Sequence, residues 1–312
     1  MSNYSSEHKL QTEEQKKLWQ QVEHHQLHIN SNVSLAWCRL RHPNSDKAIV
    51  ISNGRIESYV KYQEMFFDLH QQGYCIYALD HRGQGLSSRL TDDPQIGHID
   101  QFSDYVDDFK IFIDSIVLPA QHKFLYLLAH SMGSTIATLY LQGDQNTFKA
   151  AVFSAPMYGI KLPLPKPFIY WLAKQFANKK PNYVISGTPY QSKPFKGNRL
   201  TQSAARYRWF RELYQQQPSL QLGAPSDQWL IEALDAAESC EQALQKISTP
   251  ILILQAQCDK IVDNKAQNKF AENLKEGKLI TFISAKHELF VESDHIRNQV
   301  MDELLNFYKQ HS

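Results

Sequence analysis

The sequence contains few of the features that would assign this chain to a specialised class of protein. Its 312 residues include only four cysteines, Cys38, Cys75, Cys240 and Cys258, and none of them belongs to a C-x-x-C pair. This pattern favours buried free thiols in a reducing compartment over a disulfide framework or a cysteine metal site. The net charge is only +1, so the overall charge does not indicate a nucleic-acid-binding protein.

Long apolar runs are also missing. No stretch approaches the roughly 18 consecutive apolar residues that a membrane-spanning helix needs. Residues 1–26 are polar and lack the apolar segment of a secretory signal, so we expect a loose or helical N-terminal segment and a cytoplasmic protein. His24, His25 and His28 lack a carboxylate or cysteine at ligand spacing, which favours a polar strand start over a metal site.

Most of the remaining sequence alternates between short β-rich runs and helical patterns. The expected strands cover residues 35–41, 48–54, 74–80, 124–130, 148–156, 250–259 and 279–287. The expected helices cover residues 59–73 and 102–120, a segment that starts after Ser131, and residues 294–309. This alternation predicts an α/β fold with a doubly wound, mostly parallel sheet.

Residues 157–234 interrupt the alternation. This region is rich in proline and aromatic residues, shows helical patterns at 168–180 and 203–217, and contains no obvious buried strand. It predicts a cap inserted between two parts of the core, residues 27–156 and 235–312. The cap contains eleven Lys and Arg residues against three Asp and Glu residues. The local charge of +8 leaves two interpretations, a solvated basic face or a surface for anionic lipid headgroups.

The apolar run FLYLLAH stops at a serine, and a helical pattern begins directly after it. The local sequence is Ala129-His130-Ser131-Met132-Gly133. One interpretation is that Ser131 caps the helix. The other is that a sharp strand-to-helix turn with small residues on both sides presents Ser131 as a nucleophile. The form G-x-S-x-G is usual for such a turn, and alanine takes the first place here.

A nucleophilic serine needs a base and an acid, which follow it in the order serine, acid, histidine in this type of turn. Asp259 is the last residue of the segment 250–259, just past its apolar run ILILQAQ, and His287 is the last residue of the segment 279–287, just past the run LITFISA. Because open α/β sheets place their sites at the carboxyl ends of strands, His287 is the predicted base and Asp259 the acid that orients it. Asp263 is the rival acid. The side chain of His130 should point away from the hydroxyl of Ser131.

Two backbone N–H groups should stabilise the oxyanion that forms during ester cleavage. One is expected from Met132, the residue after the nucleophile. The other is expected from Arg55, because it follows the turn Asn53-Gly54 at the end of the strand 48–54.

Several stretches together resemble the α/β-hydrolase family, in its bacterial lysophospholipase and monoacylglycerol-lipase-like branch (serine aminopeptidase, hydrolase-4 type). The most specific stretch is DHRGQGLSSR, which matches the pattern D-x-R-G-x-G-x-S of that branch. The others are NGRIESYVKYQEMFFDLHQQGY, FSDYVDD, LAHSMGS, SAPMYGI, LQAQCDKIVDN and AKHELFVE. The resemblance implies the nucleophile Ser131, the acid Asp259 and the base His287, with oxyanion donors at Arg55 and Met132.

The loop from Asp80 to Gly85 also has a phosphate-binding interpretation. It lacks the lysine of a P-loop and the spacing of a dinucleotide-binding turn, so a structural role beside the site is favoured. Arg82 is expected to pair with a buried acid, and Glu57 to brace the oxyanion turn.

The predicted function is a serine carboxylic-ester hydrolase that acts on single-acyl-chain lipids, with a lysophospholipid as the leading substrate. The resemblance implies no metal and no organic cofactor. Alternatives are a monoacylglycerol lipase, a general carboxylesterase or lipid acyltransferase, and, in a different class, a catalytically inactive lipid-binding protein of the same fold. Of the two interpretations of the basic cap, the lipid-binding one implies peripheral contact with an anionic membrane surface, at its inner face. Its aromatic residues either line an acyl tunnel or form the core of the cap: Phe168, Tyr170, Trp171, Phe176, Trp209 and Phe210.

Overall fold

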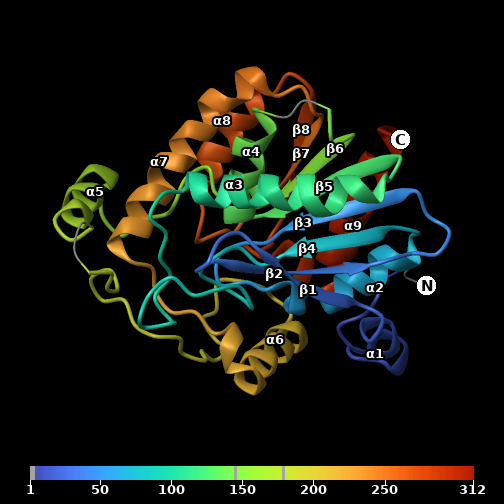
Figure 1. Ribbon diagram of the computed structural model, residues 1–312, viewed down its shortest axis with the longest axis horizontal. Helices are drawn as coiled ribbons and strands as arrows, with labels where there is room; N and C mark the ends of the chain where they lie inside the picture. The colour runs from blue at the N-terminus through green and yellow to red at the C-terminus, as the bar shows by residue number, and fades with distance from the viewer. Residues whose placement is uncertain (1–3, 144–145, 178–179) are drawn as a thin grey trace.

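The computed structural model describes residues 4–143, 146–177 and 180–312, and they contain one mixed sheet of eight strands (Figure 1). The order across the sheet is β1-β2-β4-β3-β5-β6-β7-β8. The pairs β1–β2 and β2–β4 are antiparallel, and all other pairs are parallel. The predicted doubly wound, mostly parallel sheet is therefore confirmed. The strands are β1 (Glu23–His28), β2 (Ser34–Leu40), β3 (Lys47–Ser52), β4 (Cys75–Leu79), β5 (Phe124–His130), β6 (Ala150–Ser154), β7 (Ile251–Ala256) and β8 (Gly277–Phe282).

Helices cover both faces of the sheet, and each face has its own apolar cluster. Helices α3, α4, α7 and α8 pack on one face, while α1, α2 and α9 pack on the other. The central strands are buried on both faces because they lie between these layers, which explains their continuous apolar sequences. The helices are α1 (Glu13–Trp19), α2 (Gln63–Gln71), α3 (Ser103–Phe112), α4 (Met132–Leu141), α5 (Lys166–Lys174), α6 (Ala204–Gln216), α7 (Asp227–Ala243), α8 (Asn264–Glu272) and α9 (Asp294–Gln310).

The sheet brings the expected site segments to one edge. Ser52 at the end of β3 is in register with Ala129 of β5, and His130 is in register with Ser154 of β6. The turns after β3, β5 and β7 therefore lie side by side at the carboxyl ends of parallel strands.

The region between β6 and β7 contains α5, α6 and α7. The residue limits 157 and 234 stay a prediction, and α7 continues past 234 without a break. Residues 178 and 179, which belong to the helix predicted at 168–180, lie outside the described residues. Figure 1 shows α5 at the edge of the molecule, beside α7 and away from the sheet. Helices α7 and α8 were not predicted as separate elements.

All four cysteines are free, and Cys38, Cys75 and Cys240 are buried. The expectation was wrong for Cys258, which is exposed because it lies in the turn that follows β7. Within the described residues, no helix is both long and apolar enough to cross a membrane.

Candidate active site

Ser131 lies in a strained turn between β5 and α4. Its φ and ψ angles are 51° and −117°, a conformation that non-glycine residues rarely adopt. Gly133 permits this turn, since a Cβ atom there would lie 2.2 Å from the carbonyl oxygen of Ser52. The strand and the helix can approach this closely only with glycine at that position. Steric crowding therefore explains why the motif needs a glycine at Gly133.

The hydroxyl of Ser131 does not cap the helix. Ser131 occupies the N-cap position of α4, yet its side chain accepts no hydrogen bond from the first turn. Its Oγ instead lies 3.1 Å from Nε2 of His287. This geometry removes the helix-cap interpretation and places the hydroxyl within reach of a base.

Asp259 holds the other side of the His287 ring. Its Oδ2 lies 2.7 Å from Nδ1 of His287, and its Oδ1 accepts hydrogen bonds from the backbone amides of Ile261 and Val262. Burial raises the pKa of Asp259, but His287 and the two amides outweigh burial and hold the pKa below its usual value. The rival acid, Asp263, caps α8 by accepting a hydrogen bond from the amide of Lys265.

The amides of Arg55 and Met132 are available at the same edge of the sheet. In the described part of the chain, neither amide donates a hydrogen bond to a protein acceptor. Two unpaired N–H groups beside a nucleophile are what an oxyanion site requires. The oxyanion assignment of Arg55 and Met132 remains a prediction that this arrangement supports.

Glu57 braces the turn that carries Arg55, as predicted. Its Oε2 accepts a hydrogen bond from the amide of Gly54 at 2.6 Å, a second from the hydroxyl of Tyr62, and lies 2.8 Å from Nδ1 of His130. Its Oε1 accepts a hydrogen bond from Lys61. Burial raises the pKa of Glu57, but His130 and Lys61 outweigh burial and hold the pKa well below its usual range.

This buried network connects the turn of Arg55, the turn of Ser131 and the loop that carries His287. Lys61 bridges Glu57 on the oxyanion turn and Glu288 beside the base. His130 lies between Glu57 and the backbone carbonyl of His287. The prediction that His130 points away from the Ser131 hydroxyl is consistent with these partners. Sequence reasoning missed the roles of Lys61 and Glu288, although Lys61 lies four residues after Glu57, a spacing that brings side chains together on a helical turn.

Replacing Glu57 with glutamine is expected to lower kcat by about 10- to 100-fold with a small change in KM. Loss of one oxyanion donor costs about 10²- to 10³-fold, and a loosened turn misplaces the donor without removing it. Steady-state kinetics with a single-chain ester would measure the separate effects on kcat and KM.

Glu64→Gln is the matched control, because Glu64 is another buried carboxylate with a cationic partner, Arg206, away from the oxyanion turn. This control should lower the melting temperature and leave kcat of the folded enzyme close to wild type. Equal kcat losses in both variants would contradict the bracing role.

The loop from Asp80 to Gly85 lies against the oxyanion turn and supports it. Asp80 accepts hydrogen bonds from the side chains of Asn53 and Ser58 and from the amides of Tyr59 and Leu86. Burial raises the pKa of Asp80 to about 6. The loop thus uses its polar groups internally, which supports the structural interpretation over phosphate binding.

Arg82 makes a bidentate pair with Asp108, and both distances are 2.6 Å. The predicted pairing of Arg82 with a buried acid is therefore confirmed.

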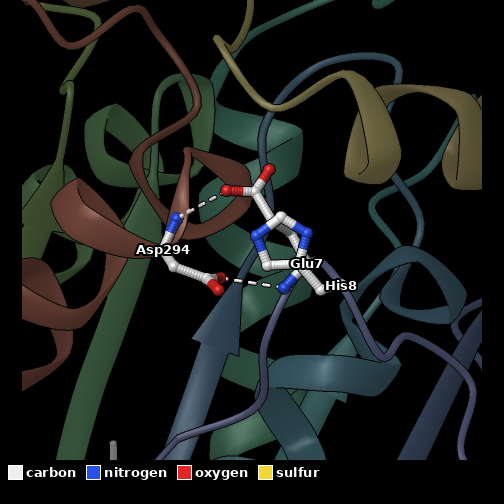
Figure 2. Close-up of side chains that lie close together, drawn as sticks. All are labelled: Glu7, His8 and Asp294. Carbon is white, nitrogen blue, oxygen red and sulfur yellow. Dashed lines mark hydrogen bonds between the residues drawn. The ribbon is translucent and has the colours of Figure 1, made fainter.

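One cluster of side chains has the composition of a metal site, and Figure 2 shows it: Glu7, His8 and Asp294. Glu7 and Asp294 exchange hydrogen bonds through each other's amides, at 3.1 and 2.9 Å. Asp294 also accepts hydrogen bonds from Ser6 and from Arg206. Because these donors occupy the carboxylates and Arg206 supplies the positive charge, the cluster joins the N-terminal segment to the start of α9.

The aromatic residues of the cap do not form a single group. Phe210 is buried and packs against Tyr207, as a residue of the cap core does. Phe168, Trp171 and Phe176 are exposed at 49, 56 and 41 %. Phe168 and Trp171 fit neither of the two expected roles, because α5 presents them to solvent, whereas Phe176 follows α5 and borders a cavity.

A cavity of about 300 Å³ lies beneath the end of α5, bordered by Phe176, Tyr183 and Ile185. None of the three predicted catalytic residues lines it, so this cavity is separate from the catalytic centre. Ser131, Asp259 and His287 are themselves buried, at 7, 2 and 4 % exposure.

The sequence matches the serine aminopeptidase, S33 (hydrolase-4) family over residues 43–294. It is 33 % identical to lysophospholipase L2 of Escherichia coli K12 over 305 residues, which cover 94 % of this chain and 89 % of that protein. It is 36 % identical to a probable lysophospholipase L2 of Haemophilus influenzae over 280 residues, with 88 % of each chain covered. Among solved structures, a soluble variant of monoglyceride lipase from Saccharomyces cerevisiae superposes with a TM-score of 0.72 at 18 % identity, covering 93 % of this chain and 97 % of that one.

Proposed function

Because this chain belongs to the serine aminopeptidase S33 (hydrolase-4) family of α/β-hydrolases, we propose that it is a lysophospholipase that uses Ser131, Asp259 and His287. The enzyme class, a serine ester hydrolase, follows from the family. The names of the two bacterial relatives support the choice of a single-chain phospholipid as substrate.

The observation that carries the proposal is a chain of hydrogen bonds through the serine, histidine and aspartate side chains, beside two unpaired backbone amides. These hydrogen bonds run from Ser131 Oγ through the His287 ring to Asp259, with distances of 3.1 and 2.7 Å. The amides of Arg55 and Met132 lie at the same edge of the sheet without acceptors in the described residues. A complete set of hydrogen bonds of this kind disfavours the alternative of an inactive lipid-binding protein.

In the first half of the reaction, Ser131 Oγ attacks the ester carbonyl carbon while His287 Nε2 takes the hydroxyl proton. The negative charge that develops on the carbonyl oxygen is stabilised by the amides of Arg55 and Met132. When the intermediate collapses, the bond to the leaving alcohol breaks and His287 returns the proton to that alcohol. Asp259 keeps Nδ1 of the ring protonated throughout, so that Nε2 can accept the proton.

In the second half, water replaces the alcohol. His287 removes a proton from water, the oxygen attacks the acyl-enzyme, and the fatty acid leaves as Ser131 regains its proton. These residues need no metal and no organic cofactor for either half. An alcohol in place of water would transfer the acyl chain to another lipid, which is the acyltransferase alternative.

Fatty-acid release from lysophosphatidylcholine, lysophosphatidylethanolamine and monooleoylglycerol tests the proposed function. Release from either lysophospholipid supports it. Release from monooleoylglycerol alone would keep the mechanism and change the function to monoacylglycerol hydrolysis. Folded protein that releases fatty acid from none of the three would contradict the proposal.

We also propose that the cap contacts an anionic membrane surface, with α5 as the contacting element. Phe168 and Trp171 are exposed on α5, with Leu164 before the helix and Ile185 after it also exposed. Lysines lie in the same segment, at Lys166, Lys174 and Lys180. Exposed aromatic residues beside lysines are typical of helices that lie in a membrane interface.

Some basic residues of the cap form ion pairs within the protein. Fewer of them are therefore left to bind lipid headgroups. Arg206 is buried and paired with Glu64 and Asp294, while Lys166 pairs with Glu238 and Lys180 with Asp92. The exposed apolar side chains therefore contribute more to this proposal than the count of basic residues. A reducing compartment, as the free cysteines suggest, would put this surface at the inner face of the membrane.

The double change Phe168→Ser and Trp171→Ser is expected to lower vesicle binding by at least about tenfold, because each side chain buries apolar area in the interface. Co-sedimentation with vesicles of phosphatidylcholine, with and without phosphatidylglycerol, measures it. Ile283→Ser is the control, because Ile283 is exposed at 66 % outside the cap. The proposed membrane contact would be contradicted if vesicle binding were the same with and without phosphatidylglycerol and the same in the wild type and the double variant.

A further inference from the structure

The side chain of Arg55 has no role in the mechanism above, which uses only its amide. Its Nη2 donates a hydrogen bond to the carbonyl of Gly223 at 2.6 Å, and its guanidinium lies 5.0 Å from the ring centroid of Trp229. Its Nε is sealed from solvent and donates to no acceptor. In the described residues no carboxylate lies within ion-pair distance of Arg55, so this is a largely desolvated cation without an anion.

Most of the other arginines with little exposure have carboxylate or carbonyl partners; Arg211 is an exception among the described residues, because its Nε also lacks an acceptor and its guanidinium donates to the hydroxyl of Tyr190. Three of the partnered arginines pair with carboxylates and a fourth donates to backbone carbonyls: Arg82 with Asp108, Arg206 with Glu64 and Asp294, Arg297 with Asp68, and Arg89 with Gly83, Gly85, Ser219 and Gln221. A desolvated cation is unfavourable without an opposite charge. Burial lowers the pKa of Arg55 to about 10, so the side chain still carries its charge at neutral pH.

The length of the Arg55 side chain is similar to the distance between the ester carbonyl carbon and the phosphorus of a lysophospholipid. Five bonds of about 1.5 Å separate the Cα of an arginine from its guanidinium carbon, which gives a reach of about 6–7 Å. In a 1-acyl lysophospholipid, six bonds separate the ester carbonyl carbon from the phosphorus, which gives about 7 Å when extended. The two lengths are therefore compatible with a substrate whose oxyanion meets the Arg55 amide while its phosphate meets the guanidinium of the same residue.

We propose that the Arg55 guanidinium binds the phosphate of the substrate headgroup while the Arg55 amide binds the oxyanion of its ester. The inference rests on the proposed lysophospholipase function and deepens it, because it gives the site a means of selecting phosphate-bearing single-chain lipids over neutral monoacylglycerols. Arginine suits this task, since its donors match phosphate oxygens, and Arg55 as a residue is only partly buried.

The test compares two substrates that differ only in the headgroup, 1-decanoyl lysophosphatidylcholine and 1-decanoylglycerol, both below their micelle concentrations. The quantity measured is the ratio of kcat/KM for the phosphate-bearing ester to kcat/KM for the neutral ester. Arg55→Met is expected to lower this ratio by roughly 10- to 100-fold, the usual effect of losing charge-assisted hydrogen bonds. Arg55→Lys should retain an intermediate ratio because it keeps the charge.

Arg89→Met is the matched control, because Arg89 also joins the core to the cap without a carboxylate partner. Its ratio should stay within about twofold of wild type even if both activities fall, since it has no place beside the ester. A ratio that stays at the wild-type value in Arg55→Met would overturn the inference and leave Arg55 as a clamp on the cap. Wild-type protein that cleaves only the decanoylglycerol would instead refute the proposed function itself.

A second measurement does not depend on whether Arg55→Met folds. Glycerophosphocholine should inhibit wild-type hydrolysis of decanoylglycerol at a concentration at least about tenfold lower than glycerol does, because it carries the phosphate. Equal inhibition by the two compounds would overturn the inference.

Discussion

Replacing Ser131 with alanine is expected to lower fatty-acid release by roughly 10⁴- to 10⁶-fold, the range found when a serine nucleophile is removed from a triad. The reason is that the variant keeps the turn and the amides of Arg55 and Met132 but has no oxygen to form the acyl-enzyme. Release from lysophosphatidylcholine measured beside wild type gives the ratio directly.

Ser134→Ala is the control for this experiment. Ser134 lies one turn further along α4 and is fully buried, and within the described part of the chain its hydroxyl has no hydrogen-bond partner. Its loss should leave both activity and melting temperature close to wild type. A Ser131→Ala protein that is folded and retains more than about 1 % of wild-type activity would contradict the nucleophile assignment.

Replacing Asp259 with asparagine is expected to lower kcat by roughly 10³- to 10⁴-fold. The asparagine oxygen can still accept from the amides of Ile261 and Val262, so the turn keeps its shape. The amide nitrogen would then face Nδ1 of His287 and donate to it, which moves the ring proton to Nε2. A ring protonated at Nε2 cannot accept the proton of Ser131.

The rival acid provides the matched comparison. Asp263 accepts a hydrogen bond from Lys265 at the start of α8, and asparagine caps a helix about as well as aspartate does. Asp263→Asn should therefore change kcat by less than about threefold, consistent with a substitution outside the site. If Asp263→Asn caused the larger loss, the assignment of the acid would have to be reversed. Circular dichroism of both variants confirms that the comparison is between folded proteins.

Much of the site could be predicted from local sequence because the relevant information is local. An apolar strand that ends at a serine followed by Met132 and Gly133 specifies the strained turn, since only glycine fits against the carbonyl of Ser52. Asp259 and His287 each follow a strand, and parallel strands bring such positions to one edge. The sequence favoured Asp259 over its rival Asp263 because Asp259 lies closer to the strand end, but which carboxylate reaches the histidine depends on where each side chain points.

The network behind the triad could not be predicted in the same way. Lys61 and Glu288 are 227 positions apart in the chain, and only the packing of the oxyanion turn against the loop of the base brings them into contact. The sequence also predicted that the cap aromatics line a tunnel or form a core, whereas α5 exposes Trp171 to solvent. A helix of this length has no orientation of its own, because the elements that it packs against decide which face is buried.

By itself, therefore, the sequence determined the sheet and the strained turn at Ser131, and it led to the predicted order of serine, acid and histidine. These depend on apolar patterning and on the steric demands of single residues, which act over a few positions. Only the tertiary structure decided which carboxylate reaches His287, which groups hold the turn of Arg55, and that Arg55 has no carboxylate partner among the described residues. Those outcomes depend on side chains from segments that are far apart in the sequence. Their charges interact strongly only when folding brings them together and excludes the water between them.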